Sequence, residues 1–391
     1  MQEVIATGCF HSALPEGQAL LEAVSAAKAA GALVLDAGDF FTGSAFSVFS
    51  RGRTEERVLA ALYDAVVPGN HDLGPLMDLD DPDRFPPVVC ANLRPPAGFR
   101  GRWTSGLVLT GAACRVGVIG YLGRQAFEAI PLHERAGFTF RAPDAALIAK
   151  ERDRLLAAGA EYVIGVSHSG FLGDVAEQQE HWPLEVVVAS HCHSPWSHWA
   201  QGSRHVAKPP AAGRGLLRMR LDANGAHHVA QELTCSSMPR RAVDDLERDV
   251  ADFAAWGAVV LGSLPRAVPD RREVGRMIAD HARILLDADL FLLNTYTLRG
   301  GLPATVTRQD LHSCAPYDSD LVVLEERPDL DGLVNSAGTL GEDVIVSRTR
   351  DRPARIATTR YLAQRLGLRA RAPVPHLTLH TTITDLLKES T

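Results

Sequence analysis

Side chains that can bind metals or move protons follow five apolar runs of this 391-residue chain, at the point where each run ends. They are Cys9, His11, Asp39, Asn70, His71, His168, His191 and His193. Imidazole suits Zn, Mn and Fe, and a carboxylate such as Asp39 can bridge two ions. Two metals about 3.5–4 Å apart can clamp a phosphate and generate hydroxide near neutral pH. The set therefore predicts a dinuclear metal centre that hydrolyses phosphoesters.

His71 has a different predicted role from its neighbours. In Pro68-Gly69-Asn70-His71-Asp72, Gly69 allows a sharp turn after a short apolar run, and three reactive side chains follow it together. If Asn70 is a ligand, His71 is left to stabilise charge or to donate a proton to the leaving oxygen. A single histidine beside a strand is more often a packed residue than a ligand. The prediction therefore depends on the joint pattern.

The elements that must position these side chains alternate between strands and helices. Residues 4–7, 32–35, 65–67, 162–166 and 185–189 form apolar runs typical of strands buried on both faces. Residues 20–30, 55–62 and 144–158 have helical apolar spacing. This order predicts an α/β fold, in which ligands bind beyond the carboxyl ends of the strands. Residues 88–93 and 115–120 are further predicted strands, and residues 216–233 predict a hairpin around Asn224-Gly225.

The chain is long enough for two domains. Residues 239–261 are charged and then apolar at helical spacing, which predicts a linking helix, and Pro265 and Pro269 mark a boundary. Beyond it, residues 274–286 predict a helix, and residues 290–293 and 321–325 predict strands. We predict a catalytic domain over residues 1–236, a linking helix over 237–264 and a substrate-binding domain over 265–391.

The composition excludes several classes of protein. Hydrophobic residues make up 46% and charged residues 22%, as in a globular protein. The net charge of -7 gives no reason to expect a nucleic acid polymer or an anionic membrane as partner. We find no apolar run long enough to span a membrane and no basic region at the N-terminus that would indicate a signal peptide. Six cysteines without a CxxC motif are expected to be reduced thiols, so we predict a cytoplasmic protein.

The order of the motifs resembles the metallophosphoesterase superfamily. Asp39 in Gly-Asp, then Gly69-Asn70-His71-Asp72, then His168 after an apolar strand and Ser190-His191-Cys192-His193 carry this resemblance. The segment Asp36-Ala37-Gly38-Asp39-Phe40-Phe41-Thr42-Gly43-Ser44 narrows it to the bacterial 5′-nucleotidase family. Asn294-Thr295-Tyr296-Thr297-Leu298-Arg299 and Pro316-Tyr317-Asp318-Ser319 are similar to that family's substrate-domain motifs.

This resemblance implies a four-layer αββα metallophosphoesterase domain followed by a C-terminal α+β substrate domain. It implies that His11, Asp39 and His193 hold one divalent metal and that Asp39, Asn70, His168 and His191 hold the other. His71 would be the catalytic histidine, and Asn294, Arg299 and Tyr317 would bind the substrate. The implied reaction is attack by metal-bound hydroxide on a small phosphorylated metabolite, of which a nucleotide 5′-phosphate is one candidate.

The chain departs from the family pattern at four places. Cys9 replaces the first aspartate ligand, which favours Zn or Fe at that site unless Cys9 only fills space. Gly74 replaces the aspartate that orients the histidine, so Asp72 is the carboxylate left nearest to His71. Tyr296-Thr297 replaces a Gly-Gly pair, and the glycine-rich loop expected after Ala363 is absent. Two alternatives remain on the same fold: a thiosulfohydrolase-like enzyme, and a redox or binding protein with a metal centre.

Overall fold

The computed structural model describes residues 1–180, 182–192, 198–222, 225–233, 243, 245–326, 328–340, 342–350 and 353–389. The chain divides into two compact units. The first consists of Met1–Thr42 and Ser50–Val250, and the second consists of Gly43–Phe49 and Ala251–Thr391. The chain thus passes between the units after Thr42, after Phe49 and after Val250. The predicted boundaries assign residues 1–236 to one domain and so do not include the passage of Gly43–Phe49 into the second unit.

Two sheets form the centre of the first unit. The strands of one, in the order β15-β14-β1-β2-β3-β4-β6, are Gly225–Leu233, Gly215–Asp222, Gln2–Thr7, Leu33–Asp36, Ala65–Val66, Val88–Val89 and Trp103–Thr104. The strands of the other, in the order β12-β13-β11-β10-β8-β7, are His198–Gln201, Arg204–Ala207, Val186–Ala189, Tyr162–His168, Arg115–Leu122 and Leu107–Thr110. Five strands precede candidate ligands: β1, β2 and β3 in the first sheet, and β10 and β11 in the second. Within each sheet these strands pair in parallel.

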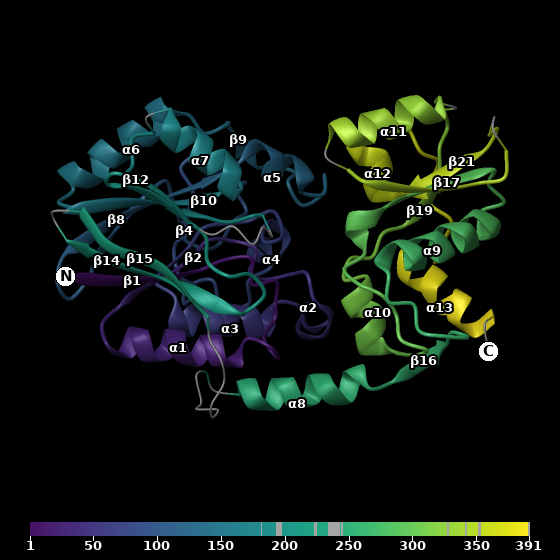
Figure 1. Ribbon diagram of the computed structural model, residues 1–391, viewed down its shortest axis with the longest axis horizontal. Helices are drawn as coiled ribbons and strands as arrows, with labels where there is room; N and C mark the ends of the chain where they lie inside the picture. The colour runs from purple at the N-terminus through teal and green to yellow at the C-terminus, as the bar shows by residue number, and fades with distance from the viewer. Residues whose placement is uncertain are drawn as a thin grey trace. The chain divides into compact units, whose positions relative to one another are not determined.

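A buried core lies between the two sheets, and helices cover their outer faces (Figure 1). Strand β8 shows the alternation: Val116 and Val118 belong to the core between the sheets, whereas Ile119 and Tyr121 belong to the cluster beneath the helices. Helices α1 (Gln18–Ala29) and α3 (Arg53–Leu62) lie on one outer side. Helices α6 (Ala145–Ala157) and α7 (Phe171–Gln179) lie on the other. This is the predicted αββα order.

The remaining elements of the first unit are short connections. Helix α4 covers Leu73–Met77 and helix α5 covers Arg124–Ala129. The predicted strand over residues 88–93 is interrupted, because β4 ends at Val89 and β5 (Leu93–Arg94) pairs instead with β9 (Thr139–Phe140). Between them, the amide of Asn92 donates to the carbonyls of Leu122 and Arg141, which turns the chain out of the first sheet. The predicted hairpin is confirmed by the antiparallel pairing of β14 with β15.

The second unit contains a mixed sheet in the order β19-β21-β17-β20, formed by Leu321–Val323, Ile356–Thr359, Leu290–Asn294 and Val344–Arg348. Helices α11 (Leu330–Thr339) and α12 (Arg360–Arg365) cover one face. Helices α9 (Arg271–Leu285), α10 (Arg308–Cys314) and α13 (Leu379–Glu389) share the core on the other. The early segment contributes α2 (Ala45–Ser50), whose Phe46 packs against Phe253.

The predicted linking helix is shorter in the structure. Helix α8 covers Leu246–Gly257, and the chain then forms strand β16 (Val260–Ser263), which pairs with β18 (Thr305–Thr307). Gly257 weakens the helix and the β-branched Val259 and Val260 favour the strand, which explains where the helix ends. The first part of the predicted helix, residues 237–242, lies outside the described residues, as does His193. Among the helices described, none has the length and apolar character needed to cross a bilayer.

Candidate metal centre

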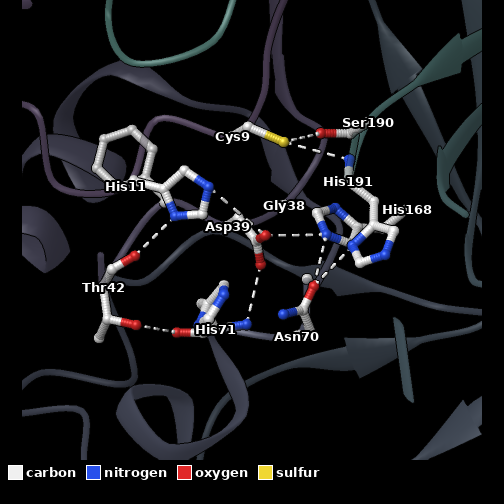
Figure 2. Close-up of polar contacts among 12 residues, drawn as sticks. Cys9, His11, Gly38, Asp39, Thr42, Asn70, His71, His168, Ser190 and His191 are labelled. Atoms are coloured by element: carbon white, nitrogen blue, oxygen red, sulfur yellow. Dashed lines mark hydrogen bonds and ion pairs between the residues drawn. The ribbon is translucent and has the colours of Figure 1, made fainter. Parts of the chain in front are cut away.

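The carboxyl ends of strands from both sheets bring the candidate ligands together. Cys9 and His11 follow β1, Asp39 follows β2 and Asn70 follows β3 in the first sheet. In the second sheet His168 is the last residue of β10, and His191 follows β11. Figure 2 shows Asp39 in the middle of this group, with His11 on one side and His168 and His191 on the other. The site is therefore built where the two sheets end together.

Asp39 belongs to two overlapping groups of metal-ligand atoms. Its carboxylate and the donor atoms of Cys9 and His11 all lie within 4.8 Å of one another, and so do the donor atoms of Asp39, His168 and His191. Oδ2 of Asp39 lies 3.2 Å from Nε2 of His168 and 3.8 Å from Nε2 of His11. A carboxylate shared in this way is the arrangement that a bridged pair of ions requires.

Asn70 joins the second group through its amide oxygen. Its Oδ1 lies 3.2 Å from Nε2 of His168 and 2.9 Å from Nδ1 of His191. Asn70 is buried, and His191 is only partly exposed. The structure thus gathers the four residues predicted for the second metal, namely Asp39, Asn70, His168 and His191.

Backbone carbonyls orient two of the imidazoles. Nδ1 of His11 lies 2.8 Å from the carbonyl oxygen of Thr42, and Nδ1 of His168 lies 2.8 Å from that of Ala37. In each ring Nδ1 donates to the carbonyl, so Nε2, on the side facing Asp39, is the nitrogen that can bind a metal once any proton on it is displaced. The sequence offers no signal for either carbonyl partner, because any residue type can supply one.

Cys9 occupies the edge of the first group. Its Sγ lies 3.1 Å from Oγ of Ser190 and accepts the backbone N–H of His191 at 3.2 Å. Burial, and then the nearby Asp39 carboxylate, raise the pKa of the Cys9 thiol to about 12. Metal binding would have to displace that proton, which a thiolate ligand always requires. Ser190 is thus a partner within the site, although its place in a motif predicted no role for it.

The charges around Asp39 support one another. Burial alone would raise the pKa of Asp39, but the imidazoles of His168, His71 and His11 outweigh it and hold the pKa well below its usual value. Burial would lower the pKa of His168, but Asp39 raises it to about 9. For His191, burial and then the charge of His168 lower the pKa to about 4, so His191 is a neutral imidazole at neutral pH. A neutral imidazole is the form that binds metals.

The backbone at the candidate ligands adopts a conformation that these residue types rarely take. Cys9, His11, Asp39 and His191 all have positive φ angles, between 47° and 79°. Each such residue costs about 1–3 kcal/mol, and such strain concentrates at functional sites. The fold thus holds several candidate ligands in place at the expense of local backbone energy.

Two glycines give the ligand loops room to approach. A Cβ on Gly69 would lie 2.2 Å from Oδ1 of Asp39, and a Cβ on Gly38 would lie 2.6 Å from Nδ1 of His168. Gly38 also has a φ of +91°. The close approach of the β2 and β3 loops therefore depends on the absence of a side chain at both positions.

Asp72 anchors these loops. Its Oδ2 accepts the backbone N–H groups of Gly69 and Asp39, both at 2.7 Å. Its Oδ1 accepts those of Phe40 and Phe41, at 3.0 and 3.1 Å. Both carboxylate oxygens are thus engaged by backbone amides, and Asp72 is fully buried. The geometry favours a loop-positioning role over the predicted orientation of the His71 ring.

His71 is held by its backbone and is partly exposed. Its N–H donates to Oδ1 of Asp39 at 2.9 Å, and its carbonyl oxygen accepts a hydrogen bond from the hydroxyl group of Thr42 at 3.1 Å. Its ring lies edge-on to that of His11, with centroids 5.3 Å apart. The imidazole therefore stands beside the candidate centre, where a proton donor to a leaving group would be needed.

The predicted substrate residues occupy different environments within the second unit. Asn294 is buried at the end of β17; its Oδ1 accepts the N–H of Tyr296 at 2.8 Å and its Nδ2 donates to Glu342. Its side chain caps the short helix that follows, and the residue is 2% exposed, so its surroundings do not support the predicted substrate contact. Arg299 is exposed; its guanidinium lies 5.6 Å from the ring centroid of Tyr317 and donates to the Tyr317 hydroxyl at 3.3 Å.

Residues 3–210, more than half of the chain, match the family model of the calcineurin-like phosphoesterases. The chain is similar to the snake venom 5′-nucleotidase of Naja atra, with 31% identity over 172 residues that cover 41% of this chain and 31% of that protein. It is similarly related to the snake venom 5′-nucleotidase of Crotalus adamanteus, with 30% identity over 172 residues covering 41% of this chain and 28% of that protein. The chain thus spans about a third of the length of these relatives.

Solved structures cover nearly the whole chain. A 5′-nucleotidase precursor from Thermus thermophilus superposes with a TM-score of 0.80 and 19% identity, over 99% of this chain and 96% of that one. The sulfate thiohydrolase SoxB of Thermus thermophilus gives a TM-score of 0.75 with 17% identity, over 96% of this chain and 80% of that one. At these identities the likeness establishes the fold, which confirms the predicted metallophosphoesterase fold followed by a C-terminal domain.

Proposed function

We propose that this chain, which belongs to the calcineurin-like phosphoesterase family, is a two-metal hydrolase of a small phosphorylated metabolite. The observation that supports it most directly is the shared position of Asp39 in two groups of ligand atoms. Hydrolysis of a phosphoester needs positive charge on both sides of the reacting phosphorus, and a bridged pair of divalent ions supplies it.

The donor set fits two divalent metals. Asp39, His168, His191 and the amide oxygen of Asn70 would hold one ion, and Asp39, His11 and Cys9 would hold the other, together with His193. The carbonyls of Thr42 and Ala37 fix the rings of His11 and His168, as second partners of metal-bound histidines commonly do. When bound, the two ions would supply Lewis acidity and lower the pKa of a water molecule. The thiol of Cys9 favours Zn or Fe at its position.

The other residues prepare the reaction. The backbone of His71 is fixed by hydrogen bonds with Asp39 and Thr42, which supports the proposal that its ring donates a proton to the leaving oxygen. Asp72 holds the two loops at a constant separation through four backbone amides. Gly38 and Gly69 permit that separation to be short.

Arg299, which is exposed, and Tyr317, which is partly exposed, support a substrate with an anionic group and a flat ring, such as a nucleotide 5′-phosphate. Arginine binds phosphate oxygens through its planar fork, and tyrosine offers a ring face for stacking. The buried position of Asn294 and the absent glycine-rich loop support a substrate other than a common nucleoside monophosphate. We therefore propose a small phosphorylated metabolite as the substrate class.

Metal analysis followed by a hydrolysis screen tests this function. Purified protein should bind two divalent metal ions per chain and release phosphate from at least one small phosphomonoester. Removing the metals with a chelator should abolish the release, and adding Zn²⁺ or Mn²⁺ should restore it. A protein that retains two metals yet hydrolyses no phosphoester would overturn the proposal. Sulfate release from a thiosulfonate would then favour a thiosulfohydrolase, and a redox-active iron centre would favour an electron-transfer role.

A further inference from the structure

A completely buried carboxylate lies behind the loop that carries His11. Glu55, on helix α3, is 0% exposed. Ser12 donates a hydrogen bond to its Oε1, and Ser50 donates to Oε1 and Oε2 at 2.8 and 2.7 Å. Among the residues described, no lysine or arginine forms an ion pair with it; Arg57, on the same helix, acts only from a distance. The hydroxyl groups of Ser12 and Ser50 thus both donate to one carboxylate, which forms no ion pair with a lysine or arginine among the residues described.

Ser12 is the residue through which Glu55 can act on the metal centre. It directly follows His11, and both have positive φ angles, 56° and 52°. Its N–H donates to the carbonyl of Phe40 at 2.7 Å, and the N–H of His11 donates to that of Asp39 at 2.8 Å. Backbone hydrogen bonds therefore hold the His11 loop to the Asp39 loop. The hydrogen bond from Ser12 to Glu55 holds the same loop to helix α3, and we call the hydrogen bonds of Glu55 with Ser12 and Ser50 the strap.

Ser50 gives the same carboxylate a second attachment. It is the first residue after Gly43–Phe49, the segment that belongs to the second unit. On the other side of that segment, the carbonyl of Thr42 accepts from His11. Glu55 thus joins the His11 loop to the point where the chain re-enters the first unit.

We propose that Glu55 is a positioning residue for the His11 side of the metal centre, where it fixes the His11 loop through Ser12 and Ser50. The proposal rests on the proposed function, since it assumes that His11 binds a metal. The ionised carboxylate accepts from both serines, whereas a protonated carboxyl turns one oxygen into a donor, so one serine hydroxyl must reorient to accept and both hydrogen bonds lose the strength that the charge gives them. Burial raises the pKa of Glu55 to about 7, although the hydrogen bonds from Ser12 and Ser50 lower it in part. The strap therefore loosens as the pH falls through neutrality.

Replacement of Glu55 by glutamine tests this role by metal binding. Metal-free Glu55→Gln protein titrated with Zn²⁺ should bind one of two ions at least about 10-fold more weakly and the other as tightly as the unchanged protein, as expected for loss of an outer partner. The difference should be larger at pH 8 than at pH 6, because protonation already weakens the strap in the unchanged protein at pH 6. Absorption spectra of the Co²⁺-loaded protein should report a changed environment at one site only.

The neighbouring Glu56 provides a matched control. It is also buried, but its carboxylate accepts the backbone N–H groups of Asp80 and Asp81, at 2.9 and 2.7 Å, away from the His11 loop. Glu56→Gln should leave both Zn²⁺ affinities unchanged even if it lowers thermal stability. Equal Zn²⁺ affinities in Glu55→Gln and the unchanged protein would overturn the proposal. It would also be overturned if Glu55→Gln and Glu56→Gln each weakened Zn²⁺ binding at both sites to the same extent.

Ser12→Ala keeps the test decisive if Glu55→Gln does not fold. It removes the link to the His11 loop and leaves Ser50 on the carboxylate, so the same selective weakening is expected. Unchanged Zn²⁺ affinities in Ser12→Ala would refute the role of the strap. The test is separate from that of the function: a protein that binds two ions but hydrolyses no phosphoester would refute the hydrolase, while the Zn²⁺ comparison would still decide the role of Glu55.

Discussion

Nε2 of His168 lies 3.2 Å from Oδ2 of Asp39, although the two residues come from different sheets of the first unit. Both are buried, and each shifts the pKa of the other in the direction that keeps the pair charged. The contact joins the carboxyl ends of β2 and β10. It therefore fixes the two sheets relative to each other at the position where the metal centre is proposed.

Replacing Asp39 should remove more metal than replacing His191. Asp39 belongs to both ligand groups, whereas His191 belongs to one. We expect Asp39→Asn to lose both ions, and His191→Ala to lose one of two; both should reduce phosphoester hydrolysis by roughly a thousand-fold, since several kcal/mol of transition-state stabilisation disappear. Metal content per chain, measured by mass spectrometry of the elements, distinguishes the two. His198→Ala is the control, because exposed His198 pairs with His205 in another part of the sheet. Full hydrolysis by His191→Ala would contradict the ligand assignment.

A methyl group at Gly69 should disturb the centre without removing a ligand. The new Cβ would lie 2.2 Å from Oδ1 of Asp39, so the loops must separate. We expect Gly69→Ala to lower the free energy of unfolding by about 1–3 kcal/mol and to weaken metal binding. Gly173, in helix α7, serves as control, because a methyl group added there would meet nothing within 4 Å. Gly173→Ala should be neutral or stabilising by about 0.5–1 kcal/mol, and equal melting temperatures for both variants would show that the close approach is unimportant.

The thiol of Cys9 should influence which metal is bound. A carboxylate is a harder donor, so Cys9→Asp should shift the preference at that site from Zn or Fe towards Mn. Reconstitution of the metal-free protein in an equal mixture of the three ions, followed by elemental analysis, measures the shift. Cys90→Ala, which alters another buried cysteine, should leave the preference unchanged. If Cys9→Asp and the unchanged protein bind the same metals, Cys9 only fills space.

The stability of the first unit should depend on pH through Asp174. It is 1% exposed; its Oδ1 accepts from Ser167 at 2.7 Å, and its Oδ2 has no hydrogen-bond partner among the described residues. Burial raises its pKa well above 3.8, so the folded protein binds this proton more tightly than the unfolded chain does. Stability should therefore fall as the pH rises from about 4 through the folded-state pKa, by about 1.4 kcal/mol for each unit of the shift.

Asp174→Asn removes this titration and should flatten the dependence of melting temperature on pH. The variant should gain stability relative to the unchanged protein at pH 8 more than at pH 5. Asp83→Asn, at an exposed position elsewhere in the first unit, should retain the original slope. Identical slopes in Asp174→Asn and the unchanged protein would show that the carboxyl is already ionised without penalty.

The sequence predicted the strands that end at the site because buried parallel strands leave a strong apolar signal. It also predicted which side chains gather at those strand ends, since imidazole, carboxylate and amide groups there are unusual without a function; their role as ligands stays a prediction. It could not predict the role of Asp72, whose four partners are backbone amides. The same limit applies to the carbonyls of Ala37 and Thr42, which orient two histidines but depend on no particular side chain.

The differences between prediction and structure elsewhere in the chain have similar causes. The linking helix was predicted too long because Val259 and Val260 continue its apolar pattern, while their pairing with β18 depends on residues far along the chain. The substrate contact of Asn294 rests on its place in a motif and stays a prediction, and nothing in the sequence indicated that its side chain caps the short helix after it. Helix α2 was missed because its short sequence, Ala45–Ser50, has no clear helical signal of its own.

The excursion of Gly43–Phe49 into the second unit limits how the protein can be divided. Phe46 and Phe49 lie 5.1 and 5.8 Å from Phe253, ring centroid to centroid, and Phe49 lies 5.8 Å from Trp256. A fragment cut after Val250 would expose two phenylalanines that the intact chain keeps against aromatic partners. To replace the second unit by that of a homologue, both Gly43–Phe49 and the chain after Val250 would have to be exchanged. One junction would lie directly after Thr42, whose hydroxyl donates to the His71 carbonyl. The two units cannot be separated by a single cut, and recombination at one point would not transfer the whole second unit.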